Sequence, residues 1–484
     1  MCYRRKMIKK YIITRNVWIF IVLLTLMTSL VVPVLRVLSE RPIILGEKSY
    51  YDMRISETVL EEGLKFRDNL VIDGRDYVAK PYHIVLASLF YFFTPENSLI
   101  AISLITGLFS VIFFYLILKK LKINLYQRFF TFVVLLLSPA FIFTFGTSNE
   151  FCISIMLLLL GTYLFLKSDK LFIYSLLVFL IATIFNLLNV IVIIFLFLFL
   201  LEIGVPKKRE AHIILAFVLI LALIYYAPLY FYGGFASKTE LVGRNTITDF
   251  ISDLGGEVGI SIFTLILGIV GITFTWKHKQ KLKNSYILML LLLFISYHFN
   301  YAMIYLNFIF SIFAGIAFAY IVKGKWEIKP LKKLTLLFLI YGLLFSSISY
   351  IGRVSVSEPD EDIQKALEWL NDNSDSEDVV FSHYSKGFWI EYLADRPVIT
   401  DGLFNYNNAK QKLEDSNTIL YSRNTEIIGK LMNKYNVKYI FIDKKMKKGQ
   451  IWDKKEGLWY AFRNNQTFKS VYYKNEVEIW KNIW

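Results

Sequence analysis

The chain of 484 residues is poor in cysteine, histidine and proline, with two, five and ten residues respectively. Cys2 lies near the start of the chain and Cys152 lies inside a hydrophobic run, so the two are not expected to form a disulfide. The segment after residue 352 has no cysteine and must be held together by its core alone. The sequence therefore excludes a disulfide-based framework.

Charged residues are nearly absent from the middle of the long hydrophobic runs. Ion-coupled carriers place charged side chains in mid-span and often break helices there with glycine or proline. Here the polar candidates gather at the ends of the runs instead. This distribution disfavours a transporter or a flippase and favours a site at a membrane interface.

The sequence is rich in hydrophobic residues. Hydrophobic residues make up 56% of the chain, and the mean hydropathy is +0.48. No soluble globular chain of this length could keep so much apolar surface out of water. We predict a polytopic α-helical protein of the cell membrane with about eleven transmembrane helices and a cytoplasmic N-terminus.

The formal net charge of +15 has a topological explanation. Lysine and arginine cluster where every second hydrophobic run ends, as at residues 119–122, 207–209 and 323–333, whereas the short turns on the other side lack them. Cations are retained on the cytoplasmic side of membrane proteins. The basic balance therefore indicates sidedness and contact with membrane lipids, and does not imply a nucleic-acid partner.

The pattern divides the chain into two parts. Residues 1–352 are predicted to form a transmembrane domain, with a first outer loop at 39–97 and a long outer loop at 233–258. The first hydrophobic run, 18–35, is too long for a cleavable signal and is interpreted as a signal anchor. Residues 353–484 alternate helical and β-like runs, which predicts a soluble α/β domain outside the cytoplasm.

Three outward-facing places carry acids near the membrane: Glu47 and Asp52 in the first loop, Asn149 and Glu150 in a short outer turn, and Glu240 in the long loop. Acids beside the hydrocarbon region are costly unless they are paired, bind a metal or line a wet cavity. Two carboxylates and an amide oxygen are suitable ligands for Mg²⁺ or Mn²⁺, which would hold a phosphate leaving group.

Each candidate has a structural alternative. Glu150 follows two capping residues and could serve only as an acid at a helix N-terminus. Asp52 precedes several further acids and could simply be solvated, and Glu240 could be an ordinary surface charge. His298 could contact a lipid phosphate or be an interfacial histidine among aromatic residues.

Five local patterns resemble the GT-C type of membrane glycosyltransferase, nearest to the oligosaccharyltransferase catalytic subunit and its archaeal relatives. Residues 49–54 resemble the family's Asp-Pro-Tyr-Tyr-His-x-Arg stretch, and residues 148–150 resemble its Asp-Asn-Glu motif. Thr239 and Glu240 lie where the family has a short Ser/Thr-x-Glu motif on an outer loop. Residues 383–397 resemble the WWDYG signature and the segment that follows it, and residues 439–443 resemble the end of the archaeal members.

The chain departs from these motifs at three points. Lys48 stands where the family has its first acid, Ser148 replaces the first acid of Asp-Asn-Glu, and only Gly387 of WWDYG is kept. The resemblance therefore implies a GT-C fold without the pocket that recognises Asn-x-Ser/Thr. Together with the Lys-, Ile- and Asn-rich composition, it also suggests an archaeal source.

The resemblance implies a glycosyltransferase that uses a polyprenyl (dolichyl) phosphate-linked sugar and a glycan, lipid or protein acceptor at the outer face. Asp52 or Glu47 would be the acid–base residue, and Asn149 with Glu150 would serve a divalent cation or the phosphate. Contacts to substrate or lipid phosphate are expected from Arg54, Glu240, His298 and Lys386. The alternatives are a catalytically inactive protein of the same fold that acts in glycan assembly, or a lipid-linked glycan flippase.

Overall fold

The computed structural model describes residues 2–202, 207–233, 247–276, 283–297, 299–404, 406–464 and 466–484. The chain forms two compact units. The first comprises Met1–Leu35, Leu99–Tyr232 and Arg244–Ser355, and the second comprises Arg36–Ser98, Gly233–Gly243 and Val356–Trp484. The sequence analysis grouped the first loop with the membrane helices, whereas the structure groups it with the C-terminal segment.

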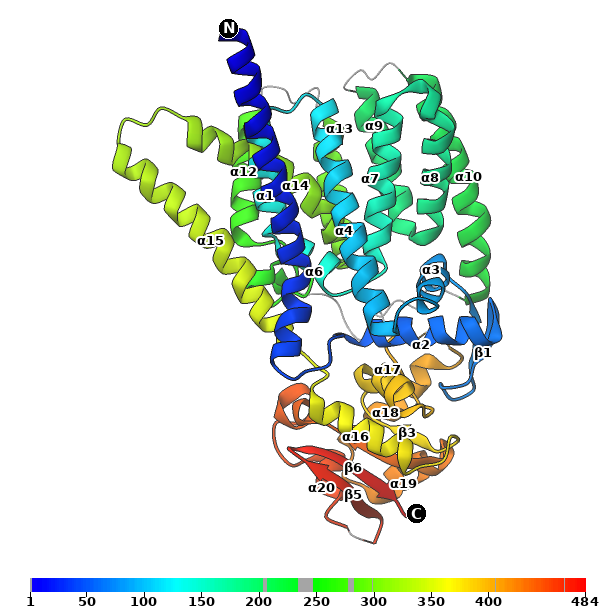
Figure 1. Cartoon of the computed structure of the whole chain (residues 1–484). Helices are drawn as coiled ribbons and strands as arrows, with labels where there is room; N and C mark the ends of the chain where they lie inside the picture. The colour runs from blue at the N-terminus through cyan, green and yellow to red at the C-terminus, as the bar shows by residue number, and fades with distance from the viewer. Residues whose placement is uncertain are drawn as a thin grey trace. The chain divides into compact units, whose positions relative to one another are not determined.

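The first unit is helical, and Figure 1 shows most of its helices running side by side. Its main helices are α1 (Cys2–Leu38), α4 (Pro95–Lys120), α5 (Leu125–Leu136), α6 (Pro139–Gly146), α7 (Phe151–Lys167), α8 (Phe172–Phe185), α9 (Leu187–Glu202), α10 (Lys208–Gly233), α12 (Ile262–Thr275), α13 (Lys283–Ser296), α14 (Ala302–Lys323) and α15 (Lys329–Ser355). Short 3₁₀ turns follow at Asp169–Leu171, Ile247–Phe250 and Ser252–Leu254.

Five helices in the described part of the chain are long and apolar enough to cross a membrane, or six if one bent pair is a single span. That pair is α5 and α6, which are bent by 66° at the break between them. Ser138 caps α6 and Pro139 begins it, which ends the preceding helix. Shorter apolar helices include α7, α9 and α12. The chain is thus a mostly helical membrane protein, and the count of eleven spans stays a prediction.

Helix α14 is the most buried of the five long apolar helices and packs against α5 and α12. Two glycines permit these contacts: a Cβ on Gly315 would lie 2.4 Å from the Thr131 backbone nitrogen, and one on Gly271 would overlap the Phe313 backbone. Small residues at helix crossings let backbones approach closely, and dispersion contacts then hold apolar helices together within lipid.

The second unit begins with the first loop, which contains α2 (Glu47–Glu62), the hairpin of β1 (Lys65–Asp68) and β2 (Arg75–Val78), and α3 (Pro81–Phe90). The six residues 69–74 join these two strands, and Asp73 and Gly74 among them have positive φ angles. The C-terminal segment adds α16 (Glu361–Asp372), β3 (Val379–Phe381), η5 (Tyr384–Lys386), α17 (Gly387–Trp389), η6 (Ile390–Ala394), α18 (Ala409–Tyr421), α19 (Thr425–Lys434), β4 (Val437–Ile442), η7 (Met446–Gln450), α20 (Gly457–Ala461), β5 (Phe468–Lys474) and β6 (Val477–Asn482).

The C-terminal strands form one sheet in the order β3-β4-β6-β5, in which only the β3–β4 pair is parallel. Helices and strands thus alternate in the C-terminal segment, as the sequence predicts. Val398 lies outside these strands and makes isolated bridges to Val71 and to Val380. These bridges join the first loop to the C-terminal sheet and position the polar residues described next.

Candidate functional site

Helix α2 carries three of the predicted site residues, Glu47, Asp52 and Arg54. The helix begins directly after Gly46, whose φ of 80° lies outside the helical region. Glu47 occupies the first turn, where an acid complements the helix dipole. It is partly exposed, whereas Asp52 and Arg54 are buried.

Asp52 is only 2% exposed, so the alternative of a solvated acid is wrong. Its Oδ1 lies 2.8 Å from Nε2 of His83 on α3. Nδ1 of His83 contacts the hydroxyl of Tyr77, which in turn accepts a hydrogen bond from the Lys80 backbone N–H. The other carboxylate oxygen, Oδ2, is buried and has no hydrogen-bond partner among the described residues.

Glu47 approaches the loop that follows η6. A Cβ added to Gly402 would lie 3.3 Å from Glu47 Oε2 and 3.2 Å from the Phe388 ring. Glycine at this position therefore leaves room for the Glu47 carboxylate. Its charge also contributes, after burial, to a raised pKa of Tyr384 of about 12.

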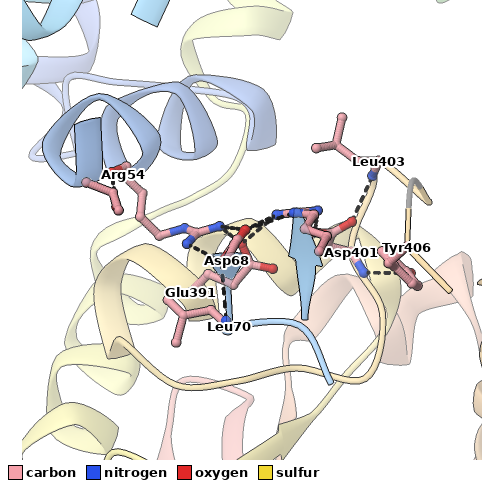
Figure 2. Close-up of polar contacts among 9 residues, drawn as sticks. Arg54, Asp68, Leu70, Glu391, Asp401, Leu403 and Tyr406 are labelled. Carbon is pink, nitrogen blue, oxygen red and sulfur yellow. Dashed lines mark hydrogen bonds and ion pairs between the residues drawn. The ribbon is translucent and has the colours of Figure 1, made fainter. Parts of the chain in front are cut away.

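Arg54 is held in a buried cluster of five charged residues, drawn in Figure 2. Its two terminal nitrogens donate to both oxygens of Asp68 at 2.8 Å, and Nη2 also lies 2.8 Å from Glu391. Arg75 pairs with Asp68 at 2.7 Å and with Asp401. The cluster thus ties α2 and the β1–β2 hairpin to two C-terminal segments.

Two cations face three carboxyl groups in this cluster. Burial opposes ionisation of Asp68, but hydrogen bonds and charge from Arg54 and Arg75 outweigh it and hold the Asp68 pKa well below its usual range. For Glu391, burial and the neighbouring acids favour the neutral form more than Arg54 and Arg75 favour the charged form. The pKa of Glu391 is therefore raised to about 8. A protonated Glu391 makes the five-residue cluster electrically neutral.

Lys386 is also enclosed by acids. Its Nζ lies 2.7 Å from Glu358 and 2.6 Å from Asp443, and its side chain is 2% exposed. Burial lowers the Lys386 pKa, but the two carboxylates outweigh burial and raise it. Arg54 and Lys386 therefore both have carboxylate partners inside the second unit, and their binding of a phosphate stays a prediction.

Asn149 and Glu150 lie in the first unit, in the turn between α6 and α7. The Asn149 side chain donates to the backbone oxygens of Phe143 and Thr144, and its Oδ1 accepts from the Phe151 N–H at 3.1 Å. Asn149 therefore caps the start of α7. Glu150 directly precedes that helix, 8% exposed, and makes no capping hydrogen bond with its side chain.

Two of the predicted site residues and the predicted metal site remain to be considered. Glu240 and His298 lie outside the described residues. Among the residues that are described, no group of three or more His, Cys, Asp or Glu side chains could hold a metal ion. The predicted Mg²⁺ or Mn²⁺ ligands include an amide oxygen and stay a prediction, and the proposed reaction does not depend on a metal ion.

Sequence analysis did not point to His83 or to four members of the charged cluster, Asp68, Arg75, Glu391 and Asp401. A signal for His83 was present, because it is a polar residue in the apolar stretch 82–93. Asp68 and Arg75 are opposed across the hairpin, but only its register reveals this. Nothing in the sequence brings Glu391 to them from more than 300 positions away.

The whole chain can be compared with solved structures. The chain is similar to an Archaeoglobus fulgidus oligosaccharyltransferase that was crystallised with a tethered acceptor peptide. The match covers 96% of this chain and 74% of that enzyme's chain, with a TM-score of 0.62 and 12% sequence identity. The match to ArnT from Cupriavidus metallidurans covers 97% of this chain and 98% of the ArnT chain, with a TM-score of 0.57 and 10% sequence identity. The chain has the GT-C fold.

A third GT-C structure extends the comparison. The arabinofuranosyltransferase AftD from Mycobacteria matches 97% of this chain, which spans 40% of that larger protein, with a TM-score of 0.58 and 10% identity. No protein-family model and no curated protein sequence matches the chain. The GT-C fold predicted from scattered motifs is thus confirmed by structure, at identities that show the fold alone.

Proposed function

We propose that this chain is a membrane glycosyltransferase that takes a sugar from a polyprenyl phosphate-linked donor at the outer face of the membrane. The fold supports this proposal over nearly the whole chain. The Archaeoglobus fulgidus enzyme has been solved with a dolichol-phosphate and an inhibitory peptide, and also with Zn and sulfate. ArnT has been solved with undecaprenyl phosphate. A lipid-borne donor is therefore the substrate class that this fold suggests.

The environment of the Asp52 carboxylate supports its assignment as the catalytic base. One oxygen contacts His83, while the other is buried without a hydrogen-bond partner among the described residues. Leaving a buried carboxylate oxygen unpaired costs free energy, and such costs are concentrated at functional sites. We assign Oδ2 as the atom that receives the acceptor's proton.

The reaction is an inverting displacement. The acceptor hydroxyl oxygen forms a bond to the anomeric carbon while the bond from that carbon to the phosphate oxygen breaks. The hydroxyl proton passes to Asp52, and the polyprenyl phosphate leaves with the electron pair of the broken bond. Glu47 is the alternative base, and Glu150 with Asn149 is proposed to serve the phosphate end of the donor.

The acceptor proposed is smaller than a sequon peptide. Only Gly387 of the WWDYG-like segment matches, and the neighbouring Lys386 is enclosed by Glu358 and Asp443. A growing lipid-linked glycan, another lipid or a surface polymer therefore suits this chain better than Asn-x-Ser/Thr.

The test is mass spectrometry of lipid-linked and surface glycans in cells with wild type, a deletion, Asp52→Asn, Glu47→Gln or Glu150→Gln. Asp76→Asn is the matched control, because Asp76 lies in the same loop and its side chain is 90% exposed. We expect the deletion to remove one sugar, Asp52→Asn to reproduce that loss at normal protein abundance, and Asp76→Asn to resemble wild type.

One alternative role rests on a specific observation. Lys48 and Ser148 replace two acids of the motifs that the chain resembles. A protein of this fold that assists glycan assembly without catalysis would leave every sugar linkage intact in all three point variants. Loss of the sugar with Glu47→Gln but not with Asp52→Asn would move the base to Glu47.

A further inference from the structure

His83 is the residue that fixes Asp52 in place. The two side chains are 1% and 2% exposed, and Nε2 and Oδ1 are 2.8 Å apart. A carboxylate only accepts hydrogen bonds, so Nε2 carries the proton and donates it to Oδ1. Nδ1 is then free to accept from the Tyr77 hydroxyl.

The series continues beyond the imidazole. The Tyr77 oxygen accepts from the Lys80 backbone N–H at 3.1 Å. Each group in this series therefore has one direction of donation, from the Lys80 backbone to Tyr77, from Tyr77 to His83, and from His83 to Asp52. A consistent direction fixes the histidine tautomer as the one that presents N–H to the carboxylate.

Two packed helices carry the side chains of this hydrogen-bonded series. Asp52 lies on α2, and His83 lies on α3, which packs against α2 through Tyr51, Ile55 and Ala87. The rings of Tyr51 and Tyr82 lie within 6 Å of the imidazole, at 5.8 and 5.9 Å between centroids. Packed rings restrict rotation of the imidazole, and helices hold a reacting group more accurately than loops do.

We infer that His83, oriented by Tyr77, is a positioning residue that turns Asp52 so that only Oδ2 faces the acceptor. The inference rests on the proposed function and adds residues that no sequence motif marked. Because both ring nitrogens of His83 have partners, His83 acts on the acceptor only through Asp52.

The experiment measures initial rates in membranes. Membranes from cells that overproduce each full-length variant are mixed with a lipid extract of the deletion strain, which supplies the unprocessed donor and acceptor. Product is followed by mass spectrometry, and the melting temperature of each purified variant is recorded. The variants are Asp52→Asn, His83→Ala, His83→Gln, Tyr77→Phe and the double variant Asp52→Asn/His83→Ala.

We expect Asp52→Asn to lower the rate about 100-fold or more. His83→Ala should lower it roughly 10- to 100-fold, because a small misplacement of a reacting group is costly. His83→Gln restores a side-chain N–H donor and should recover much of the rate, and Tyr77→Phe should lose less than His83→Ala. The double variant should be no slower than Asp52→Asn alone, since residues that act as a unit are not additive.

The control is Tyr91→Phe, which makes the same chemical change as Tyr77→Phe at a residue that is 76% exposed. Its rate should equal that of wild type. If wild-type membranes form no product, the proposed function fails and the inference fails with it. If wild type is active but His83→Ala and His83→Gln lose equally, or the double variant is slower than Asp52→Asn, the inference is overturned and the glycosyltransferase stands.

Discussion

At the scale of single residues, Glu391 shows how a buried cluster sets its own protonation. Asp68 and Asp401 already balance the charges of Arg54 and Arg75, so a third negative charge has no cation of its own. Burial then raises the Glu391 pKa to about 8. A carboxyl whose folded pKa exceeds its unfolded value stabilises the fold most below the unfolded pKa.

This predicts how stability depends on pH. The contribution of Glu391 is fully present below about pH 4.5 and is lost as the pH rises through about 8. Glu391→Gln stays neutral, so its melting temperature should fall less than that of wild type between pH 6 and pH 9. Differential scanning fluorimetry across this range measures the difference, with exposed Glu414→Gln as the control. Parallel curves for wild type and Glu391→Gln would contradict the prediction.

At the scale of elements, the β1–β2 hairpin pairs over only four residues in each strand, and buried ion pairs add to this short ladder. Asp68 accepts from both arginines of the cluster. Removing one partner of a buried ion pair leaves the others uncompensated, which costs about 3–5 kcal/mol. Asp68 therefore links the hairpin to both arginines, in addition to the bridge from Val71 to Val398.

Asp68→Ala should accordingly release the hairpin. We expect a lower melting temperature and faster proteolysis within residues 64–80, measured by limited digestion of the purified protein in detergent. Asp76→Ala, on the same hairpin and exposed, should digest as wild type does. Equal digestion of Asp68→Ala and wild type would show that the ion pairs do not hold the hairpin.

Close helix packing gives a second test at this scale. A Cβ on Gly315 would overlap the Thr131 backbone, whereas a Cβ on Gly352 of α15 has no heavy atom within 4 Å. Gly315→Ala should therefore destabilise the bundle by about 1–3 kcal/mol through overpacking. Gly352→Ala should be neutral or slightly stabilising, because alanine favours helix. Thermal unfolding in detergent distinguishes the two, and an unchanged Gly315→Ala would contradict the packing.

At the scale of the whole molecule, the sequence predicts sidedness that chemical labelling can check. In a Cys2→Ser background, Lys454→Cys should react with a membrane-impermeant maleimide in intact cells. Lys333→Cys should react only after permeabilisation, because basic clusters are retained inside. Both lysines are exposed in their own units, so access to reagent is not limited by packing. The reverse pattern would invert the proposed topology.

Much of the fold was predictable because hydrophobic runs and strand-like runs are local patterns. The alternation of helices and strands predicted for residues 353–484 is present, as in the helix Glu361–Asp372 and the strands Val437–Ile442 and Phe468–Lys474. The grouping of the first loop with the C-terminal segment was not predictable, because it depends on Arg54 meeting Glu391 and on Val71 bridging Val398. Asp52 was predicted as an acid beside the membrane, but nothing local in the sequence pairs it with His83.

The second unit has a consequence for biogenesis. Arg54 and Glu391 are 337 positions apart, and nearly all of the first unit is synthesised between them. At roughly 5–20 residues per second, about 20–70 s of translation separate the two residues. During that interval the first loop emerges without its partner strands and acids. A chain stalled or truncated before Val356 therefore has a first loop that lacks the residues which Arg54 and Val71 contact in the 484-residue chain, and we expect protease to digest that loop faster.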